Sequence, residues 1–351
     1  MAELPRSEAY ASVFVMPENR FLPRHWSIFQ AIVVIAFASV ALGAPAKERI
    51  HFVPKFIVGE MLRYRIAQRS VTTAKTTTPI ANPEGATSVS ESIDLLVRLD
   101  VLDPPQGAVK PGDARFRATY EQSEAGSQTD AFDPNAPSLK DRYMRLEGNS
   151  IEFTMEPSGE LVNLNGLEDI FPNLSETDPI LSWVQSVSAG RRLPREGILI
   201  GQKWSNERPL AGAPLTGFIW RMESTYLRDD PCKGGATTGE PPASSAGRDA
   251  CAVILTHFEI LHHGSQSEST PEEFRKNGLR TAGTWTGSGE SLDSISLASG
   301  LLESSTQTST QDTDYEISSA TRGSKIHYVG KLQSQSEITF VSGSGPQSLA
   351  H

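Results

Sequence analysis

The sequence lacks the short patterns that mark most catalytic and cofactor sites. It has no G-x-S-x-G elbow, no S-x-x-K, no H-E-x-x-H, no phosphate-binding loop and no dinucleotide fingerprint. Its 42 acidic residues are scattered, so a pair of catalytic carboxylates cannot be assigned from spacing. We therefore expect a protein that is not an enzyme and that holds no cofactor. An undetected hydrolase is the least favoured alternative.

Runs of basic residues are also missing. The formal net charge is −10, and residues 1–46 hold as many acidic as basic side chains, so the rest of the chain has the same net charge. Binding to nucleic acid depends on clustered Lys and Arg that displace counterions from phosphates. The composition therefore excludes nucleic acid as the expected partner.

Cysteine is scarce, with only two in the chain, and they do not have the C-x-x-C spacing of a redox motif. Cys232 and Cys251 flank a stretch rich in Gly, Pro and Ser that has turn chemistry and no apolar period. We predict a disulfide that closes the loop 230–251. In the chain-entropy model a loop of this length gains about 3 kcal/mol from such a bond.

The N-terminal segment 1–46 indicates export. Arg20, Arg24 and His25 precede the apolar run Ser27–Gly43, and small residues suited to a signal peptidase follow. Because this run is shorter than the roughly 20 residues that span a bilayer, we interpret the segment as an N-terminal extension with a signal peptide. The alternative is an uncleaved anchor, which would be the only membrane contact. Either way we expect the body of the protein in the periplasm or outside the cell.

Two similar β-hairpins suggest the architecture. In 150–164, Ile151, Phe153 and Met155 alternate before a turn that ends at Gly159, and the segment around Gly300 repeats the device. Each hairpin lies downstream of a strand start with a hydrophobic residue, Gly and a polar residue in sequence, at 57–60 and at 200–203. We predict an α+β, predominantly antiparallel β fold: a curved sheet or half-barrel in two related halves with one short connecting helix.

The domain boundaries follow from this pattern. We expect a first β-rich half at 47–165, a helical connection at 166–197 and a second β-rich half at 198–345. Apolar alternation predicts strands in both halves, including one at 93–101 and a hairpin between 218–226 and 252–261. The polar segments 71–90 and 122–137 are expected as loops, and Tyr143–Leu146 as part of a meander. The segment 281–310 is expected as further short strands, and 325–343 as the last pair of strands.

The connecting helix is expected at 179–189. Asp178 and Pro179 suit its first positions, and apolar residues, among them Trp183, recur at helical spacing before Gly190. The Trp183 stripe is typical of a helix face that packs on a core.

Two polar groups were weighed as sites. His257, Glu259 and His263 share one face of a strand, and His262 is adjacent. Their geometry allows a metal site, but no second element offers further ligands, so we predict no metal.

Five arginines stand opposite the apolar face on three N-terminal strands and form a stripe that suits either an anionic surface or plain solvent. These arginines are Arg63, Arg65, Arg98, Arg115 and Arg117.

The strand start FIVGEMLRYRI, the segment LPREGILIGQKW at 193–204 and the late segment GSGESLDSISLASGLLESST resemble secreted bacterial envelope proteins made of uncharacterised β-rich domains. These proteins are similar in pattern to the half-barrels of periplasmic lipoprotein carriers. The resemblance implies a curved antiparallel sheet whose concave apolar face holds acyl chains. It implies no catalytic residue.

We therefore expect a non-catalytic exported envelope protein that binds a lipid-like or other apolar ligand on a concave sheet. The predicted lining consists of Tyr64, Phe116, Phe153, Trp220 and Tyr226. The alternative for these aromatics is that they form the core. The alternative function is a scaffold or partner in an envelope assembly, which would use an exposed sheet edge such as Thr306–Thr310.

Overall fold

The computed structural model describes residues 49–77, 87–103, 112–130, 139–157, 159–168, 171, 179–187, 193–210, 215–232, 249–263, 270–319 and 323–344. All of these residues belong to one compact unit, Arg49–His351. The predicted signal or anchor at 1–46 and most of the loop between the two cysteines lie outside the described residues.

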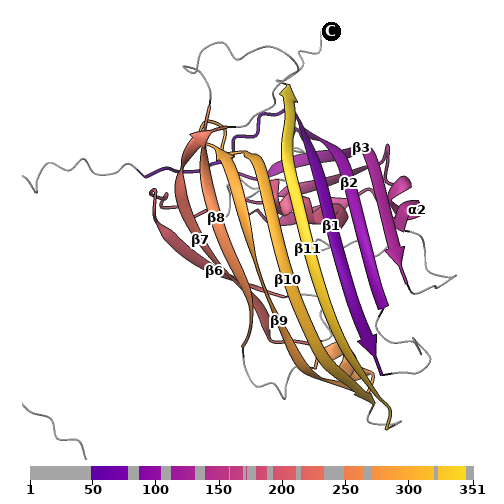
Figure 1. Cartoon of the computed structure of the whole chain (residues 1–351). Helices are drawn as coiled ribbons and strands as arrows, with labels where there is room; N and C mark the ends of the chain where they lie inside the picture. Colours follow the sequence, from indigo (N-terminus) through magenta and orange to yellow (C-terminus); the bar gives the residue numbers. More distant parts are fainter. Residues whose placement is uncertain are drawn as a thin grey trace, which may run out of the picture. The chain divides into compact units, whose positions relative to one another are not determined.

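One eleven-stranded antiparallel sheet forms the body of this unit (Figure 1). The strands are β1 (Met61–Thr76), β2 (Thr87–Leu102), β3 (Ala114–Thr129), β4 (Ser150–Met155), β5 (Leu161–Asn165), β6 (Lys203–Pro209), β7 (Phe218–Pro231), β8 (Ala250–His262), β9 (Leu279–Ser296), β10 (Leu302–Ser319) and β11 (Lys325–Ser344). The helices are α2 (Leu139–Met144), α3 (Pro179–Val187) and α4 (Glu272–Lys276). The strand order is β5-β4-β3-β2-β1-β11-β10-β9-β8-β7-β6.

The first and last strands of the chain pair in the interior of this sheet. The β1–β11 ladder runs from Met61 opposite Ser344 to Thr76 opposite Tyr328. All other strands that are adjacent in the sheet are also consecutive in the sequence. The strands β5 and β6 are consecutive in the sequence but lie at opposite edges of the sheet. The predicted halves therefore share one unclosed curved sheet, which confirms the predominantly antiparallel prediction. The α+β assignment, the domain boundaries and a relationship between the halves stay predictions.

The two glycine-initiated strand starts adopt the same local structure. Gly59 (φ +82°) and Gly201 (φ +84°) both have a positive φ, which Gly adopts without steric cost. The Gly59 N–H donates to the carbonyl of Val101 at 2.8 Å, and the Gly201 N–H donates to that of Tyr226 at 2.6 Å. In both places the turn is tied to the strand that follows next in the sheet. The similarity noticed in the sequence therefore corresponds to equivalent turns.

Several sequence predictions are wrong at the ends of strands. The expected loops 71–90 and 122–137 are partly strand, since β1 continues to Thr76, β2 begins at Thr87 and β3 continues to Thr129. Polar side chains there sit on a sheet that is solvated on both faces, so the apolar alternation that reveals a strand is absent. For the same reason 279–319 forms two strands of 18 residues each and 325–344 a single one.

Helix predictions had a mixed outcome. The connecting helix is confirmed as α3, whereas α4 was not anticipated and the segment expected to hold a strand at Tyr143–Leu146 begins in α2 instead. In α2, Tyr143 is buried and its neighbour Met144 is exposed, an arrangement that a two-residue alternation also produces. So short a helix cannot be distinguished from a strand by periodicity.

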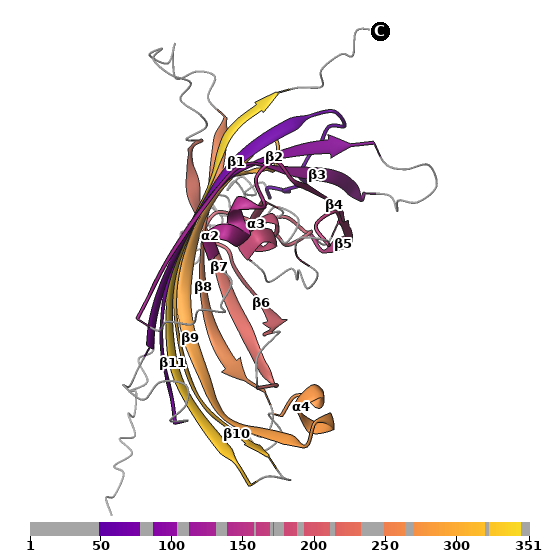
Figure 2. The same ribbon diagram turned by 90° about the vertical axis from the view of Figure 1, so that its right-hand side faces the viewer.

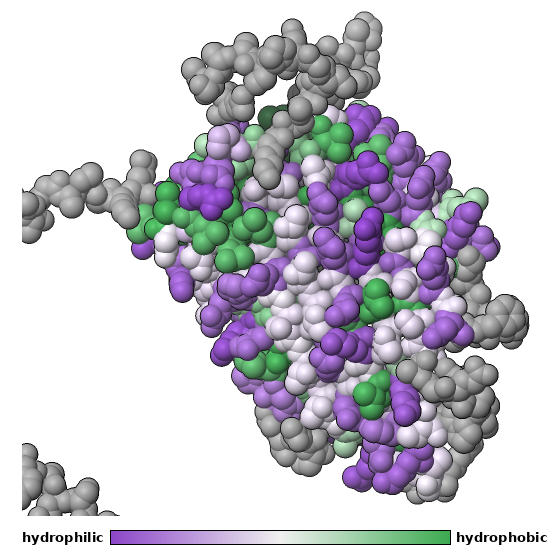
Figure 3. Space-filling model, in the orientation of Figure 1, coloured by the Kyte–Doolittle hydropathy of each residue, from purple (hydrophilic) through white to green (hydrophobic). Residues whose placement is uncertain are grey.

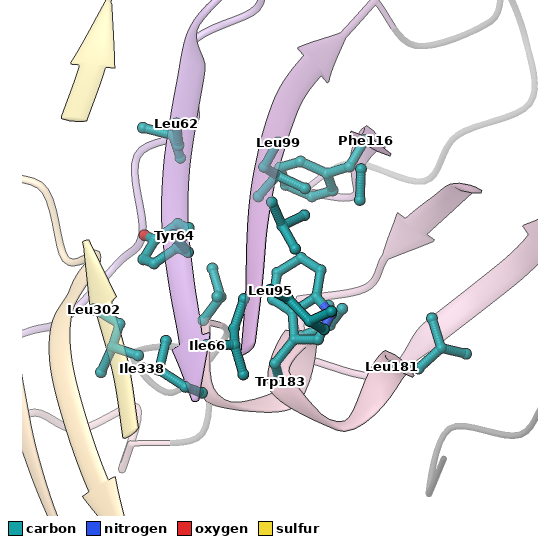
Figure 4. Packing of buried hydrophobic residues seen from close by; sticks show 14 of the residues in the cluster. Leu62, Tyr64, Ile66, Leu95, Leu99, Phe116, Leu181, Trp183, Leu302 and Ile338 are labelled. Atoms are coloured by element: carbon teal, nitrogen blue, oxygen red, sulfur yellow. The ribbon is translucent and has the colours of Figure 1, made fainter. Parts of the chain in front are cut away.

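The hydrophobic core lies between one end of the sheet and the helices. Figure 2 shows α2 and α3 on the concave side of the sheet, near the ends of β1 and β2. Buried residues of β1 and β2 alternate, and Trp183 and Leu181 of α3 are buried in the same cluster. Figure 4 shows Trp183 pointing toward Leu95 and Ile66 of the sheet. The Trp183 stripe therefore serves as a core face.

On the concave face the same strands change character along their length. On β1, buried Leu62, Tyr64 and Ile66 are followed on the same face by Gln68 and Ser70, which are half-buried. On β11, Ile338 gives way to Ser336 and Ser334. The apolar core therefore occupies one part of the concave face and leaves the other part polar.

The convex face is largely polar. Figure 3 shows this face as hydrophilic and neutral residues with separate apolar patches. The five arginines of the predicted stripe lie here, and each pairs with a carboxylate: Arg63 and Arg98 with Glu121, Arg65 with Asp94, and Arg115 and Arg117 with Glu152. The arrangement of the stripe on one face is confirmed, and three carboxylates offset part of its five positive charges.

The predicted disulfide is present between Cys232 and Cys251, with Cα atoms 4.9 Å apart. Cys251 is buried on β8, and Cys232 lies just beyond the end of β7. The bond therefore joins the two strands of the confirmed β7–β8 hairpin at the base of their connection.

Two glycines in β9 leave room for large side chains of the neighbouring strand β8 to pack over them. A Cβ on Gly289 would overlap the Phe258 ring of β8 and the Thr308 carbonyl oxygen of β10. At Gly287 the nearest atoms to such a Cβ include Ile260 at 3.0 Å. Large side chains of the neighbouring strand thus cover glycines that have none of their own.

We expect Gly289→Ala to lower the free energy of unfolding by about 1–3 kcal/mol, because the new methyl group overpacks this contact. The measurement is urea denaturation. Ser288→Ala is the matched control, since Ser288 is exposed on the convex face of the same strand, and it should change stability by less than about 0.5 kcal/mol. Equal stability of the two variants would contradict the proposed contact.

Candidate binding groove

A groove of about 690 Å³ lies over the concave face, beside α3 and over β1, β2 and β6–β11. Strands from both predicted halves form its floor because β1 and β11 pair. Ser182, Trp183 and Ser186 of α3 line one end of it. The volume falls within the range of about 300–1,000 Å³ typical of ligand pockets.

The end of the groove near α3 is apolar. Trp183 contributes from the helix, Ile254 and Ile295 from β8 and β9, and Trp204 from β6. Ile254 and Ile295 are buried, while Trp204 is half-buried. Apolar side chains also line the wall formed by β7 and β8, where Trp220, Met222 and Phe258 remain partly accessible.

The middle of the groove is lined by neutral polar side chains arranged in rows across the strands. One row holds Gln68, Ser336, Gln307, Ser291, Thr256 and Ser224. The next row continues from Ser70 through Ser334 and Ser309 to Gly289. The register of the sheet thus brings together hydroxyl and amide groups that are far apart in the sequence.

Some of these groups hydrogen-bond to one another. The hydroxyls of Ser224 and Thr256 lie 2.8 Å apart, and those of Ser309 and Ser334 lie 2.7 Å apart. These cross-strand pairs fix side-chain positions on the floor of the groove.

Three charged residues line the groove among those that the structure describes. They are Glu91 of β2, Asp293 of β9 and Arg208 of β6. The Ser305 hydroxyl donates to Asp293 at 2.6 Å. The net charge of these three residues is therefore slightly negative, and they lie on three separate strands.

The five aromatics predicted to line a ligand site are placed differently from one another. Tyr64, Phe116, Phe153 and Tyr226 are buried in the core cluster, and the Phe116 and Phe153 rings stack with centroids 5.4 Å apart. Trp220 lines the groove and meets the Phe258 ring edge to face at 5.3 Å. The structure thus assigns core packing to four of them, and a ligand contact stays a prediction.

Sequence reasoning missed the polar rows. Their signal was present as unbroken runs of Ser, Thr and Gln at 305–311 and of Gln and Ser at 333–336, but such residues are also common on solvated strands. The predicted exposed edge at Thr306–Thr310 is wrong, since β10 pairs with β9 on one side and β11 on the other. The edges of the sheet are β5 and β6.

The histidine group does not converge. His257 pairs with Glu290 at 3.0 Å, Glu259 pairs with Arg221, and the His263 ring lies 3.8 Å from a Glu207 oxygen. Within the described ranges, no three His, Cys, Asp or Glu side chains are grouped so that they could hold a metal ion.

A partly buried acidic group, Glu303, lies beside the core. One carboxyl oxygen of Glu303 and the hydroxyl of Tyr64 are buried without a hydrogen-bond partner among the described residues. Burial, and secondarily the negative charge of Asp249, raises the pKa of Glu303 above its ordinary value. Burial, with the nearby charges of Glu303 and Glu60, also raises the pKa of Tyr64.

The similarity of this chain to known proteins is confined to solved structures. No protein-family model and no curated protein matches the sequence. Among solved structures, a lipovitellin structure concerned with lipid–protein interactions is similar over 85% of this chain, with a TM-score of 0.42 and 11% identity. The match covers 26% of that chain, so this protein spans about a quarter of its length. A likeness this weak carries no argument about function.

No helix in the described part of the chain combines the length and the apolar character needed to cross a bilayer.

We expect Glu303→Gln to raise the thermal unfolding midpoint at pH 8, by no more than about 2 °C because the carboxyl is only half-buried. A carboxyl whose pKa is raised by folding favours the folded state when protonated, so its contribution is lost as pH rises through that pKa. The gain should therefore shrink as the pH is lowered toward 4.5.

Glu196→Gln is the control, because Glu196 is exposed. Thermal unfolding at several pH values compares the two variants with the wild type. A Glu303→Gln midpoint that stays below the wild type at pH 8 would contradict this account of Glu303.

Proposed function

We propose that this protein is a non-catalytic, exported envelope protein that binds an amphipathic, lipid-like molecule in the concave groove. The observation that carries the proposal is the division of the groove into an apolar end beside α3 and a neutral polar middle. A ligand with an apolar part and a polar part complements both regions at once.

Accessible apolar side chains of the groove supply the binding free energy in this proposal. Partly accessible Trp204, Trp220 and Met222 lie on the groove wall, where they contact water in the free protein. Covering them gains about 25 cal/mol for each Å² of apolar surface removed from water. An acyl or similar chain laid along this wall supplies such cover without requiring directional contacts.

Support for a non-catalytic role comes from the positions of the ionisable groups. The two groove carboxylates are Glu91 on β2 and Asp293 on β9, and β1, β11 and β10 lie between those strands. At about 4.8 Å per strand they are about 19 Å apart along the sheet, beyond the separation used by carboxylate pairs in glycoside hydrolysis.

The disulfide supports the location. A Cys232–Cys251 bond is typical of proteins that mature in an oxidising compartment outside the cytosol. We propose that residues 1–46 direct this export and that the protein resides in the periplasm or outside the cell.

The resemblance to envelope proteins and carrier half-barrels is part of the same proposal. The resemblance implies a curved antiparallel sheet, and the unclosed curved antiparallel sheet supports this part of the proposal. The equivalent turns at Gly59 and Gly201 support a relationship between the two halves. The alternative scaffold role gains no support from the sheet edges, because β5 and β6 have only five and seven residues, and short edge strands resist pairing with other chains.

We expect native mass spectrometry of the protein purified from an envelope fraction to show an added mass of several hundred daltons that organic extraction removes. Met222→Glu should reduce the retained fraction about tenfold or more, because a carboxylate on the apolar wall loses its hydration when the ligand binds.

Thr225→Glu is the matched control, since it places the same charge on the convex face of β7. It should retain the ligand as the wild type does. Bare wild-type protein that also fails to take up added lipid would contradict the proposal and favour the scaffold alternative.

A further inference from the structure

We infer that the polar part of the ligand is an uncharged polyhydroxylated headgroup, such as a sugar joined to an acyl chain. This inference rests on the proposed function, since it names the chemistry of the polar end of the same ligand. It is carried by the neutral row, the set Gln68, Ser336, Gln307, Ser291, Thr256 and Ser224 that crosses the groove on six adjacent strands.

The neutral row offers unused hydrogen-bonding groups. The side chains of Gln68, Ser291, Gln307 and Ser336 make no hydrogen bond to any part of the chain that the structure describes. Each amide provides two donors and one acceptor group, and each hydroxyl both donates and accepts. Sugar hydroxyls have the same dual character, so a polyol can bond repeatedly along this row.

The charges of the groove disfavour an anionic headgroup. Phosphates and carboxylates are usually held by Arg or Lys, which supply several charged donors. Here Arg208 is the single basic side chain of the described groove lining and is outnumbered by Glu91 and Asp293. Lys75 and Lys331 of the adjoining strands lie on the convex face.

Aromatic surfaces stand at one end of the neutral row. Trp204 of β6 pairs with Ser224 and so continues the row, and Trp220 lies two rows away on the neighbouring strand. Both indoles are half-buried in the groove wall. A sugar ring has a face of C–H groups with slight positive charge, which packs favourably on the electron-rich face of an indole. Neutral hydrogen-bonding groups beside accessible tryptophans thus suit a glycan better than a phosphate.

The test compares amphiphiles with the same dodecyl chain and different headgroups: dodecyl maltoside, dodecyl phosphocholine, dodecyl phosphate and a dodecyl polyethylene glycol ether. Each is titrated below its critical micelle concentration into the full chain freed of retained ligand, with tryptophan fluorescence as the readout. We expect the maltoside to bind about tenfold more tightly than the other three.

A paired variant locates the preference. Gln68→Ala with Gln307→Ala should remove most of the advantage of the maltoside and leave the affinity for the ether within about twofold of the wild type. Gln333→Ala with Gln335→Ala is the matched control, because both glutamines are exposed on the convex face of β11. The control should keep the wild-type preference, and thermal unfolding should show that both variants fold.

The outcomes separate the two proposals. Equal affinity for all four amphiphiles, tighter binding of the phosphate, or an unchanged preference in the Gln68/Gln307 variant would overturn the headgroup inference while amphiphile binding stands. No binding of any of the four would overturn the proposed function and this inference with it.

Discussion

The pairing of β1 with β11 is the constraint on which the rest of the structure depends. Because the first and last strands meet in the interior of the sheet, the remaining strands extend outward on both sides to the edges β5 and β6. The chain must therefore pass from one edge to the other between β5 and β6. That connection contains α3, which lies on the concave side (Figure 2). The strand order therefore requires a connection between the two edges, and the helix in that connection covers part of the concave face.

This crossing explains why the core occupies only part of the sheet. Where α3 crosses, the strands present residues such as Ile66, Leu95 and Ile338, and Trp183 packs on them from the other side (Figure 4). Beyond the crossing the same strands carry Ser, Thr and Gln on that face, and no described helix covers them there as α3 covers the core. Long hydrogen-bonded ladders hold this part of the sheet, and Phe258 covers Gly289.

The sequence predicts the elements best where burial is one-sided. The hairpin at Gly159, the strand 93–101 and the helix around Trp183 are confirmed because one face of each is apolar and the other polar. The long strands β9, β10 and β11 were missed as continuous units because both of their faces are polar in much of their length. Periodicity of hydrophobic residues cannot report a strand that buries little.

The groove was harder to predict than the fold for a related reason. Aromatic residues at strand positions predict burial, and Tyr64, Phe116, Phe153 and Tyr226 are indeed buried, but burial in a core and contact with a ligand give the same pattern in the sequence. Only the register shows that Gln68 and Ser224 share a row, because that requires the β1–β11 pairing, which no local pattern encodes.

The concave face thus has an apolar part, which packs against α3, and a polar part on the same strands. A sheet that is apolar under a helix and hydrophilic beyond it needs no further protein to be stable, since water satisfies the exposed hydroxyls and amides. Water solvates the accessible tryptophans poorly, because an indole offers a single polar atom and a large apolar surface. The same end of the neutral row that carries Trp204 adjoins the helix-covered core. A bound molecule would cover these rings, and its polar groups would replace water along the row. It would thus continue the layer that α3 forms on the concave face, which is the physical basis for a site at this position.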